Sequence, residues 1–338
     1  MESTSLPENA LSHIRDTVSI ALDHAADRPT VVVYDEQSGL SRRVGEAYRT
    51  VLPMARAVNF DQTPPEAILE IIDSLSPGDL VVLVQSDSFR LSRFRIRIEL
   101  FKRGLKVIEH PHLSRMRPEE YGTYFEALAY DPSYYRTVGP FLKERISRAS
   151  RITIFGEKTE LIYDTGFLEP KLNIGHYEGM KNIGGQFPIG EVFTEPADLR
   201  AVNGEVNLFA FGDADFSVHV PEKPFTVLIE KGLLISSTDA PAGFLAVLDE
   251  IRRQEETVSV RELGFGLNRA FSRERPVADI GSYERMCGIH LSLGAKHLQY
   301  KKPEFPRKQG FHVDAFVEAK RVEIDGITVF RDGAYEFR

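Results

Sequence analysis

Along the first part of the chain, segments with the apolar spacing of a helix alternate with short apolar segments typical of strands. Apolar residues recur at helical spacing over residues 8–26, and short apolar runs such as residues 29–35 and 77–86 are typical of buried strands. Strands and helices that alternate at this length predict parallel strands with helices on both faces. We therefore predict a doubly wound α/β domain over residues 1–150.

The hydrophobic period changes after a connecting helix at residues 134–150. Short alternating or apolar strands, separated by Gly, Asp and Pro turns, dominate the rest of the chain. One helix is expected at residues 240–254, and an Asp-Gly turn near the end predicts a hairpin over residues 321–330. This pattern predicts a larger, β-rich α+β domain over residues 151–338.

The composition narrows the class of protein further. A length of 338 residues fits about two domains. No apolar run approaches the ~20 residues of a membrane helix, and the first residues lack the pattern of a signal peptide. The net charge of −8 argues against non-specific nucleic-acid binding, and no glycine-rich nucleotide signature is present. We expect a cytoplasmic protein with neither a membrane nor a nucleic-acid partner.

The single cysteine, Cys287, limits the metal chemistry that is open to the chain. It excludes an internal disulfide and a thiolate-cage metal site, which leaves His, Glu and Asp as the strong ligands. His312 and Asp314 stand two residues apart in a strand-like segment, so both project from the same face. His290 begins another apolar strand, Glu262 precedes two glycines, and Glu191 follows a glycine-rich turn.

Each of these side chains alone has an ordinary explanation as a paired core residue or a cap. Together they provide two nitrogen and at least three oxygen donors, a mixture that suits zinc, cobalt, manganese or ferrous iron. Two such ions ~3.5–4 Å apart can activate a bridging water and polarise a carbonyl group. The set therefore predicts hydrolytic metal chemistry in the second domain.

One candidate lies in the first domain. Glu109, His110 and His112 follow a predicted strand, and ligands of such sheets gather at the carboxyl ends of the strands. Either this segment is a polar surface loop, or His110 reaches the substrate of a site that is built mainly elsewhere.

Four segments of the second domain carry a resemblance to a known family. Residues 182–196 (NIGGQFPIGEVFTEP), 261–268 (RELGFGLN), 289–294 (IHLSLG) and 312–314 (HVD) occur in the same order as in the thermophilic leucyl aminopeptidases typified by aminopeptidase T. The first domain resembles that family only in layout. The resemblance implies a two-metal aminopeptidase-like fold that is dimeric in its relatives. It assigns metal-ligand positions to Glu191, Glu262, His290, His312 and Asp314.

The chain also departs from the peptidase pattern. Arg285 stands where the peptidases have a glutamate, and His297 stands where they have a tyrosine. Glu284 is one residue away and offers a substitute carboxylate through a shifted turn. His297 suits a proton-handling role because imidazole titrates near neutrality, and a plain loop histidine is the alternative.

A second group with the same fold is also similar to this chain. The 2,5-dihydroxypyridine ring-cleaving dioxygenases use one non-haem iron(II), and such sites need two histidines and one carboxylate. His290, His312 and Asp314 could supply that triad. The presence of both Glu191 and Glu262 favours the two-metal hydrolase.

Three hypotheses follow. The leading one is a homodimeric metal-dependent hydrolase, resembling leucyl aminopeptidases, that cleaves an amide of a small molecule or peptide. It uses two divalent ions (Zn, Co or Mn), with Glu262 or His297 handling protons and His110 contacting substrate. The second is an Fe(II) ring-cleaving dioxygenase acting on a hydroxylated N-heteroaromatic compound. The third is a non-catalytic scaffold with a structural metal or none.

Overall fold

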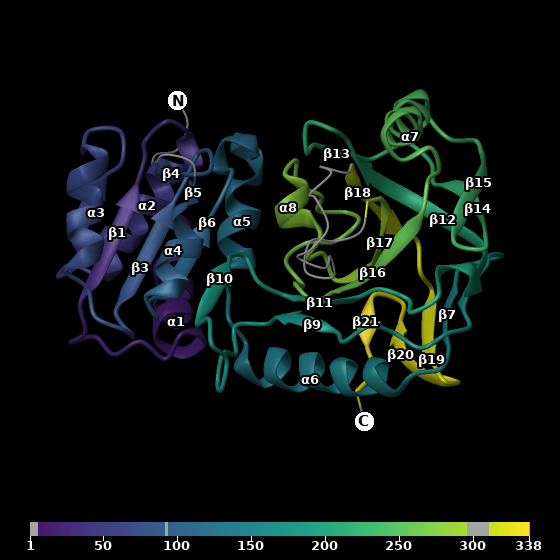
Figure 1. The fold of residues 1–338 in the computed structure, drawn as a ribbon, viewed down its shortest axis with the longest axis horizontal. Helices are drawn as coiled ribbons and strands as arrows, with labels where there is room; N and C mark the ends of the chain where they lie inside the picture. Colours follow the sequence, from purple (N-terminus) through teal and green to yellow (C-terminus); the bar gives the residue numbers. More distant parts are fainter. Residues whose placement is uncertain (1–5, 92–93, 296–310, 338) are drawn as a thin grey trace. The chain divides into compact units, whose positions relative to one another are not determined.

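Two large sheets, one parallel and one antiparallel, organise the chain (Figure 1). The computed structural model describes residues 6–91, 94–295 and 311–337. The predicted combination of a parallel α/β sheet and a β-rich antiparallel part is confirmed. Contacts divide the chain into unit 1 (Met1–Tyr135 and Gly175–Ile189) and unit 2 (Arg136–Ile174 and Gly190–Arg338).

This division differs from the single boundary at residue 150 that the sequence predicts. The helix α6 (Pro132–Arg148) begins in unit 1 and continues into unit 2. The chain then returns to unit 1 because β10 (Gly184–Gln186) pairs with β6 (Lys106–His110) as an additional parallel strand.

The sheet of unit 1 has the strand order β10-β6-β3-β1-β2, and all of its pairs are parallel. β1 (Thr30–Tyr34) and β3 (Leu80–Val84) are buried along their whole length, which explains their continuous apolar runs. β2 (Arg56–Asn59) forms the edge next to β1. A short hairpin of β4 (Arg90–Leu91) and β5 (Phe94–Arg95) follows β3.

Helices cover both faces of this sheet, as the doubly wound pattern predicts. The isoleucines of α3 (Pro65–Asp73) and Ile96 of α4 (Ile96–Lys102) share a core cluster with Val31, Val33 and Leu83 of the sheet. On the other face, α2 (Gly39–Val51) and α5 (Tyr121–Ala127) each bring a tyrosine to His110. The unit also contains α1 (Ala10–Asp16), a π-helical turn at Thr17–Ala21 and 3-10 turns at Leu113–Arg115 and Pro118–Glu120.

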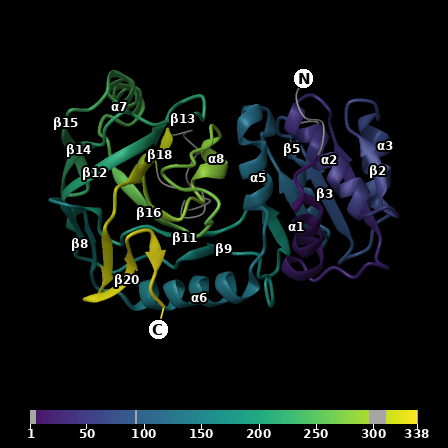
Figure 2. The same cartoon turned by 180° about the vertical axis from the view of Figure 1, so that it is seen from behind.

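Unit 2 is built on the antiparallel sheet. Its main path runs β21-β20-β19-β7-β8-β12-β18-β17-β16-β11-β9, and β13, β14 and β15 attach to β12. The strands are β7 (Ile152–Phe155), β8 (Glu160–Tyr163), β9 (Lys171–Asn173), β11 (Glu191–Thr194), β12 (Val202–Gly212), β13 (Val218–His219), β14 (Phe225–Glu230), β15 (Leu233–Thr238), β16 (Val260–Gly266), β17 (Gly288–Gly294), β18 (His312–Val317), β19 (Arg321–Ile324), β20 (Ile327–Arg331) and β21 (Ala334–Tyr335). Figure 2 shows the late strands β18 and β20, in yellow, as parts of this unit.

Besides the larger part of α6, further helical segments accompany this sheet among the described residues. They are the 3-10 turn Leu199–Ala201, α7 (Ala242–Glu255) and the short α8 (Ile280–Tyr283). The predicted C-terminal hairpin is confirmed as β19 and β20, joined at Asp325 and Gly326, which both have positive φ.

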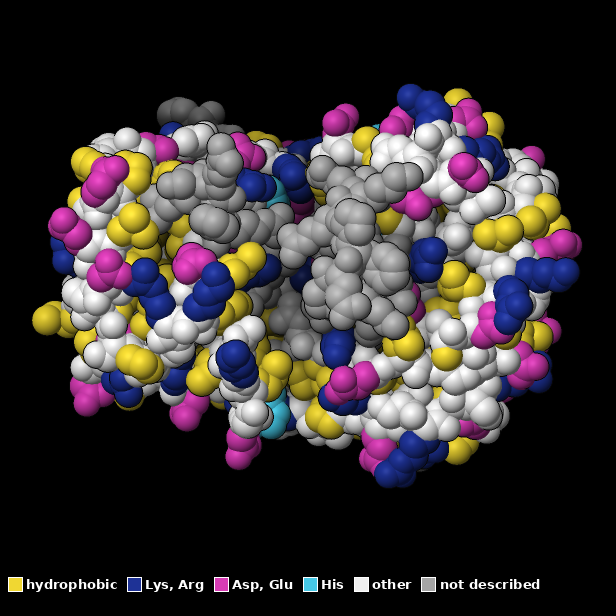
Figure 3. Space-filling model, viewed as in Figure 1, with side chains coloured by type: hydrophobic (Ala, Val, Ile, Leu, Met, Phe, Trp, Pro, Cys, Tyr) yellow, Lys and Arg dark blue, Asp and Glu magenta, His cyan; other side chains and the backbone are white. Residues whose placement is uncertain are grey.

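The surface carries charges of both signs. Figure 3 shows Lys and Arg side chains interspersed with Asp and Glu side chains on the face drawn. Among the described residues, no helix combines the length and the apolar character that crossing a bilayer requires.

Candidate metal centre

Four neighbouring strands of unit 2 bring the candidate ligands to one face of the sheet. Between β17 and β18, Gly294 pairs with His312, Ser292 with Asp314, and His290 with Phe316. Side chains of paired residues in antiparallel strands project from the same face. His290, His312 and Asp314 therefore share a face, as the two-residue spacing predicts for the last two.

The neighbouring strands add the two glutamates to this face. Gly264 of β16 pairs with His290, and Gly266 of β16 pairs with Glu191 of β11. A bulge between Val260 and Leu263 inserts one extra residue into β16, next to Glu262. Bulges of this kind commonly re-aim a side chain beside a functional site.

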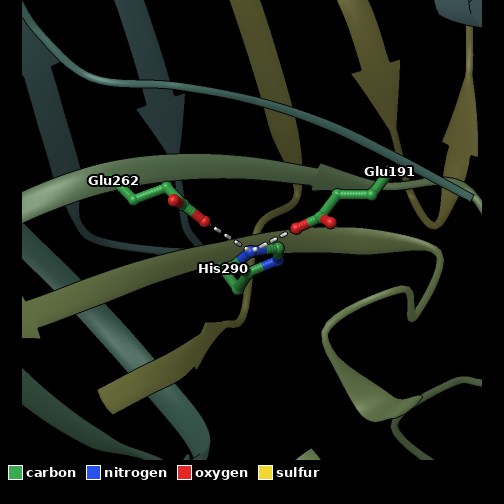
Figure 4. A group of neighbouring side chains, drawn as sticks. All are labelled: Glu191, Glu262 and His290. Atoms are coloured by element: carbon green, nitrogen blue, oxygen red, sulfur yellow. Dashed lines mark ion pairs between the residues drawn. The ribbon is translucent and has the colours of Figure 1, made fainter. Parts of the chain in front are cut away.

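Glu191, Glu262 and His290 converge on one point. Nε2 of His290 lies 3.3 Å from Oε1 of Glu191 and 3.6 Å from Oε1 of Glu262 (Figure 4). The two carboxylates approach Nε2 from opposite sides. All three residues are buried, and each offers a ligand atom within 4.8 Å of the others.

A second group shares one of these residues. Nε2 of His312 lies 3.4 Å from Oδ1 of Asp314, and Glu262 completes the group with ligand atoms within 4.8 Å of one another. Nδ1 of His312 lies 3.3 Å from the carbonyl oxygen of Ala295. When Nδ1–H donates to this carbonyl oxygen, the unprotonated Nε2 is left to act as the ligand. Glu262 thus belongs to both triads.

The distances within the first triad fit metal coordination better than direct hydrogen bonding. Ligand atoms with bonds of about 2.1 Å to a tetrahedral ion are about 3.4 Å apart, close to the separations found here. Within the described part of the chain, neither ring nitrogen of His290 has a hydrogen-bond partner although the ring is fully buried. Buried polar atoms are rarely left so, and a cation between the three side chains would satisfy Nε2. The donor set therefore fits a divalent metal.

In the absence of a cation, the two histidines of the centre carry the positive charge that faces its carboxylates. Burial by itself lowers the pKa of His290, but the adjacent carboxylates of Glu191 and Glu262 outweigh burial and raise that pKa to about 10. The pKa of His312 is likewise lowered by burial and raised by Asp314, with a net increase to about 9. Two protonated imidazoles then offset two of the three carboxylate charges, and binding of a metal would release these protons.

His110 occupies the core of unit 1. Its Nε2 is 2.8 Å from the hydroxyl of Tyr48 and its Nδ1 is 2.8 Å from the hydroxyl of Tyr124. The side chain is fully buried, and burial lowers its pKa to about 3. These contacts account for His110 as a neutral core residue, and the predicted contact with substrate stays a prediction.

The remaining predicted residues have different outcomes. His297 lies outside the described residues. Arg285 is buried and forms an ion pair with Glu284, so the carboxylate of Glu284 is engaged by its neighbour. Ser292 and Gly264 are supporting residues of the centre. In the segment RELGFG, Gly264 stands two residues after Glu262, and this spacing is the sequence signal that could have identified it.

The fold is similar to two solved structures. The 2,5-dihydroxypyridine dioxygenase from Pseudomonas putida aligns with a TM-score of 0.64 and 13% identity, covering 98% of this chain and 98% of that chain. Wild-type AmpT from Thermus thermophilus aligns with a TM-score of 0.58 and 12% identity, covering 97% and 98%. No family model and no curated protein sequence matches the chain. Both resemblances predicted from the sequence are confirmed at the level of the fold.

Proposed function

We propose that the chain is a metal-dependent hydrolase that cleaves an amide or peptide bond with a metal-activated water. The observation that carries the proposal is the position of Glu262, which belongs to both ligand triads on one sheet face. A carboxylate shared in this way is what a centre with two adjacent ions requires. The similarity to AmpT supports the aminopeptidase type of hydrolase.

The ligand roles follow from the two triads. Glu191 and His290 would hold one ion, His312 and Asp314 would hold the other, and Glu262 would serve both. Three carboxylates set about three negative charges against the four positive charges of two divalent ions. When bound, such ions lower the pKa of a water and polarise a carbonyl group.

The protein side chains supply the rest of the chemistry. Buried carboxylates interact strongly with a cation because little water screens them. Proton transfer is assigned to Glu262 or His297, and His110 is retained as a candidate substrate contact. Zn, Co or Mn suits the mixture of imidazole and carboxylate donors. We further propose a cytoplasmic homodimer that acts on a small molecule or peptide, without nucleic-acid or membrane partners.

An iron(II) ring-cleaving dioxygenase is the second candidate, which the similarity to the Pseudomonas putida enzyme supports. That chemistry would draw two histidines and one carboxylate around a single ion. Among the described residues, however, His290 and His312 fall in different ligand groups, each with Glu262. This separation favours the two-metal hydrolase.

Metal content and activity distinguish the candidates. Protein purified without oxygen is loaded with Zn²⁺, Co²⁺ or Mn²⁺ and tested on a panel of aminoacyl amides and dipeptides. We expect hydrolysis that is lost in Glu191→Gln and in Glu191→Gln/His312→Ala. Hydrolysis that survives the double substitution would contradict the proposal. One iron per chain together with oxygen consumption on a dihydroxypyridine would establish the second candidate instead.

A further inference from the structure

The imidazole of His290 lies directly over a position that has no side chain. Its register partner on β16 is Gly264. A Cβ atom placed on Gly264 would lie 2.6 Å from Cδ2 of His290 and closer still to Nε2 and Cε1. Non-bonded carbon atoms pack at about 3.5–4.0 Å, so the ring occupies the volume that any larger residue at 264 would fill.

No hydrogen bond at the second ring nitrogen, Nδ1, fixes the orientation of this ring among the described residues. A metal-ligating histidine normally donates its second N–H to a carbonyl or carboxylate oxygen, and His312 has Ala295 at that position. In the part of the chain that the structure describes, Nδ1 of His290 has no such partner. Its Nε2 forms ion pairs with Glu191 and Glu262, and the ring lies over Gly264 and near the ring of Phe316, whose centroid is 6.0 Å away. The space over Gly264 therefore allows the ring to place Nε2 between the two carboxylates.

We propose that Gly264 is a positioning residue for the Glu191–Glu262–His290 triad. It provides the surface on which the imidazole lies, so that Nε2 points between the two glutamates. This inference rests on the proposed metal centre and deepens it. It concerns one ion of the two, because His312 has its own contact with Ala295.

The variant Gly264→Ala tests the inference. Because the obstructing atoms belong to a side chain that can rotate, we expect the variant to fold with the ring displaced. Stripped protein is titrated with Zn²⁺ and with Co²⁺, and bound metal is measured by calorimetry and elemental analysis. The expected result is about 10–100-fold weaker binding of one of two equivalents, with the second equivalent retained.

A matched control is Gly243→Ala in α7. Its new Cβ would lie 3.5 Å from Cζ of Phe211, which is ordinary contact, and both equivalents should bind as in the wild type. Folded Gly264→Ala that binds both equivalents unchanged would overturn this inference alone. Wild-type protein that binds neither ion would overturn the proposed function and this inference together.

A further variant covers the case in which Gly264→Ala does not fold. In Gly264→Ala/His290→Ala the ring is removed, and with it the obstruction. Recovery of folding supports the assignment, because it shows that the imidazole is what the methyl group meets. Failure to recover overturns it, because the destabilising contact then lies elsewhere.

Discussion

The backbone N–H of Glu262 donates a hydrogen bond to the hydroxyl oxygen of Ser292, at a distance of 3.0 Å. The bulge in β16 stands at this point, where the strand register with β17 shifts. Ser292 is itself the register partner of Asp314. One buried hydroxyl thus ties β16, the strand of the shared ligand Glu262, to β17, the strand of His290, at the position that pairs with Asp314 of β18.

This contact predicts the effect of Ser292→Ala. The substitution leaves the N–H of Glu262 without its acceptor in a buried site, which costs about 1–3 kcal/mol of unfolding free energy. Loss of a supporting hydrogen bond should also weaken metal binding about 10–100-fold. Denaturant unfolding and calorimetric titration measure the two effects. Ser236→Ala, at an exposed position of β15, serves as the control, and equal behaviour of the two variants would refute the role of Ser292.

The buried His110 predicts how stability depends on pH. Burial lowers the pKa of His110 to about 3 from an ordinary value of 6.5. Between these values the unfolded chain binds a proton that the folded chain does not. The contribution of His110 is therefore complete above pH 6.5 and is lost progressively as the pH falls toward 3, by up to about 1.4 kcal/mol per pH unit.

Comparison with His110→Gln isolates this contribution. Unfolding free energies of both proteins are measured from pH 7.5 to pH 4. Any constant destabilisation by the variant shifts its curve without changing the slope. We expect the wild type to lose stability more steeply below pH 6.5, and parallel curves would show that His110 does not remain neutral in the folded state.

Metal removal should lower thermal stability. A ligand that binds only the folded state stabilises it by about 2.7 kcal/mol when its free concentration is 100 times its Kd. The melting temperature should therefore fall after chelation and recover when Zn²⁺ or Co²⁺ is restored. His290→Ala/His312→Ala is the control, because it should melt at the same temperature with and without added metal. A wild-type melting temperature that does not change when chelator is added would favour a scaffold without a bound metal.

Local sequence pattern was sufficient to predict part of this structure. The fully apolar runs of β1 and β3 marked a buried parallel sheet, and the spacing of His312 and Asp314 placed both on one strand face. The five predicted ligands do meet on that face. Short-range periodicity carries this information because it determines which side chains share a surface.

Long-range pairing could not be predicted in the same way. β10 consists of Gly184, Gly185 and Gln186, with no apolar residue to mark it as a strand, so its return to unit 1 was missed. The bulge beside Glu262 depends on the register between β16 and β17, which the sequence of either strand does not contain. The position of His110 at the end of a predicted strand indicated a contact with substrate. In the structure, two tyrosines from separate helices bond its ring nitrogens, a pairing that the local sequence does not contain.

The number of metal ions bound by the wild type and by Glu262→Gln tests the central claim most directly. Elemental analysis and calorimetric titration with Zn²⁺ should give two ions per chain for the wild type. Because Glu262 belongs to both triads, Glu262→Gln should weaken both sites, whereas Glu191→Gln should weaken only one. A wild type that binds a single ion, or a folded Glu262→Gln that retains two with unchanged affinity, would contradict the two-metal centre.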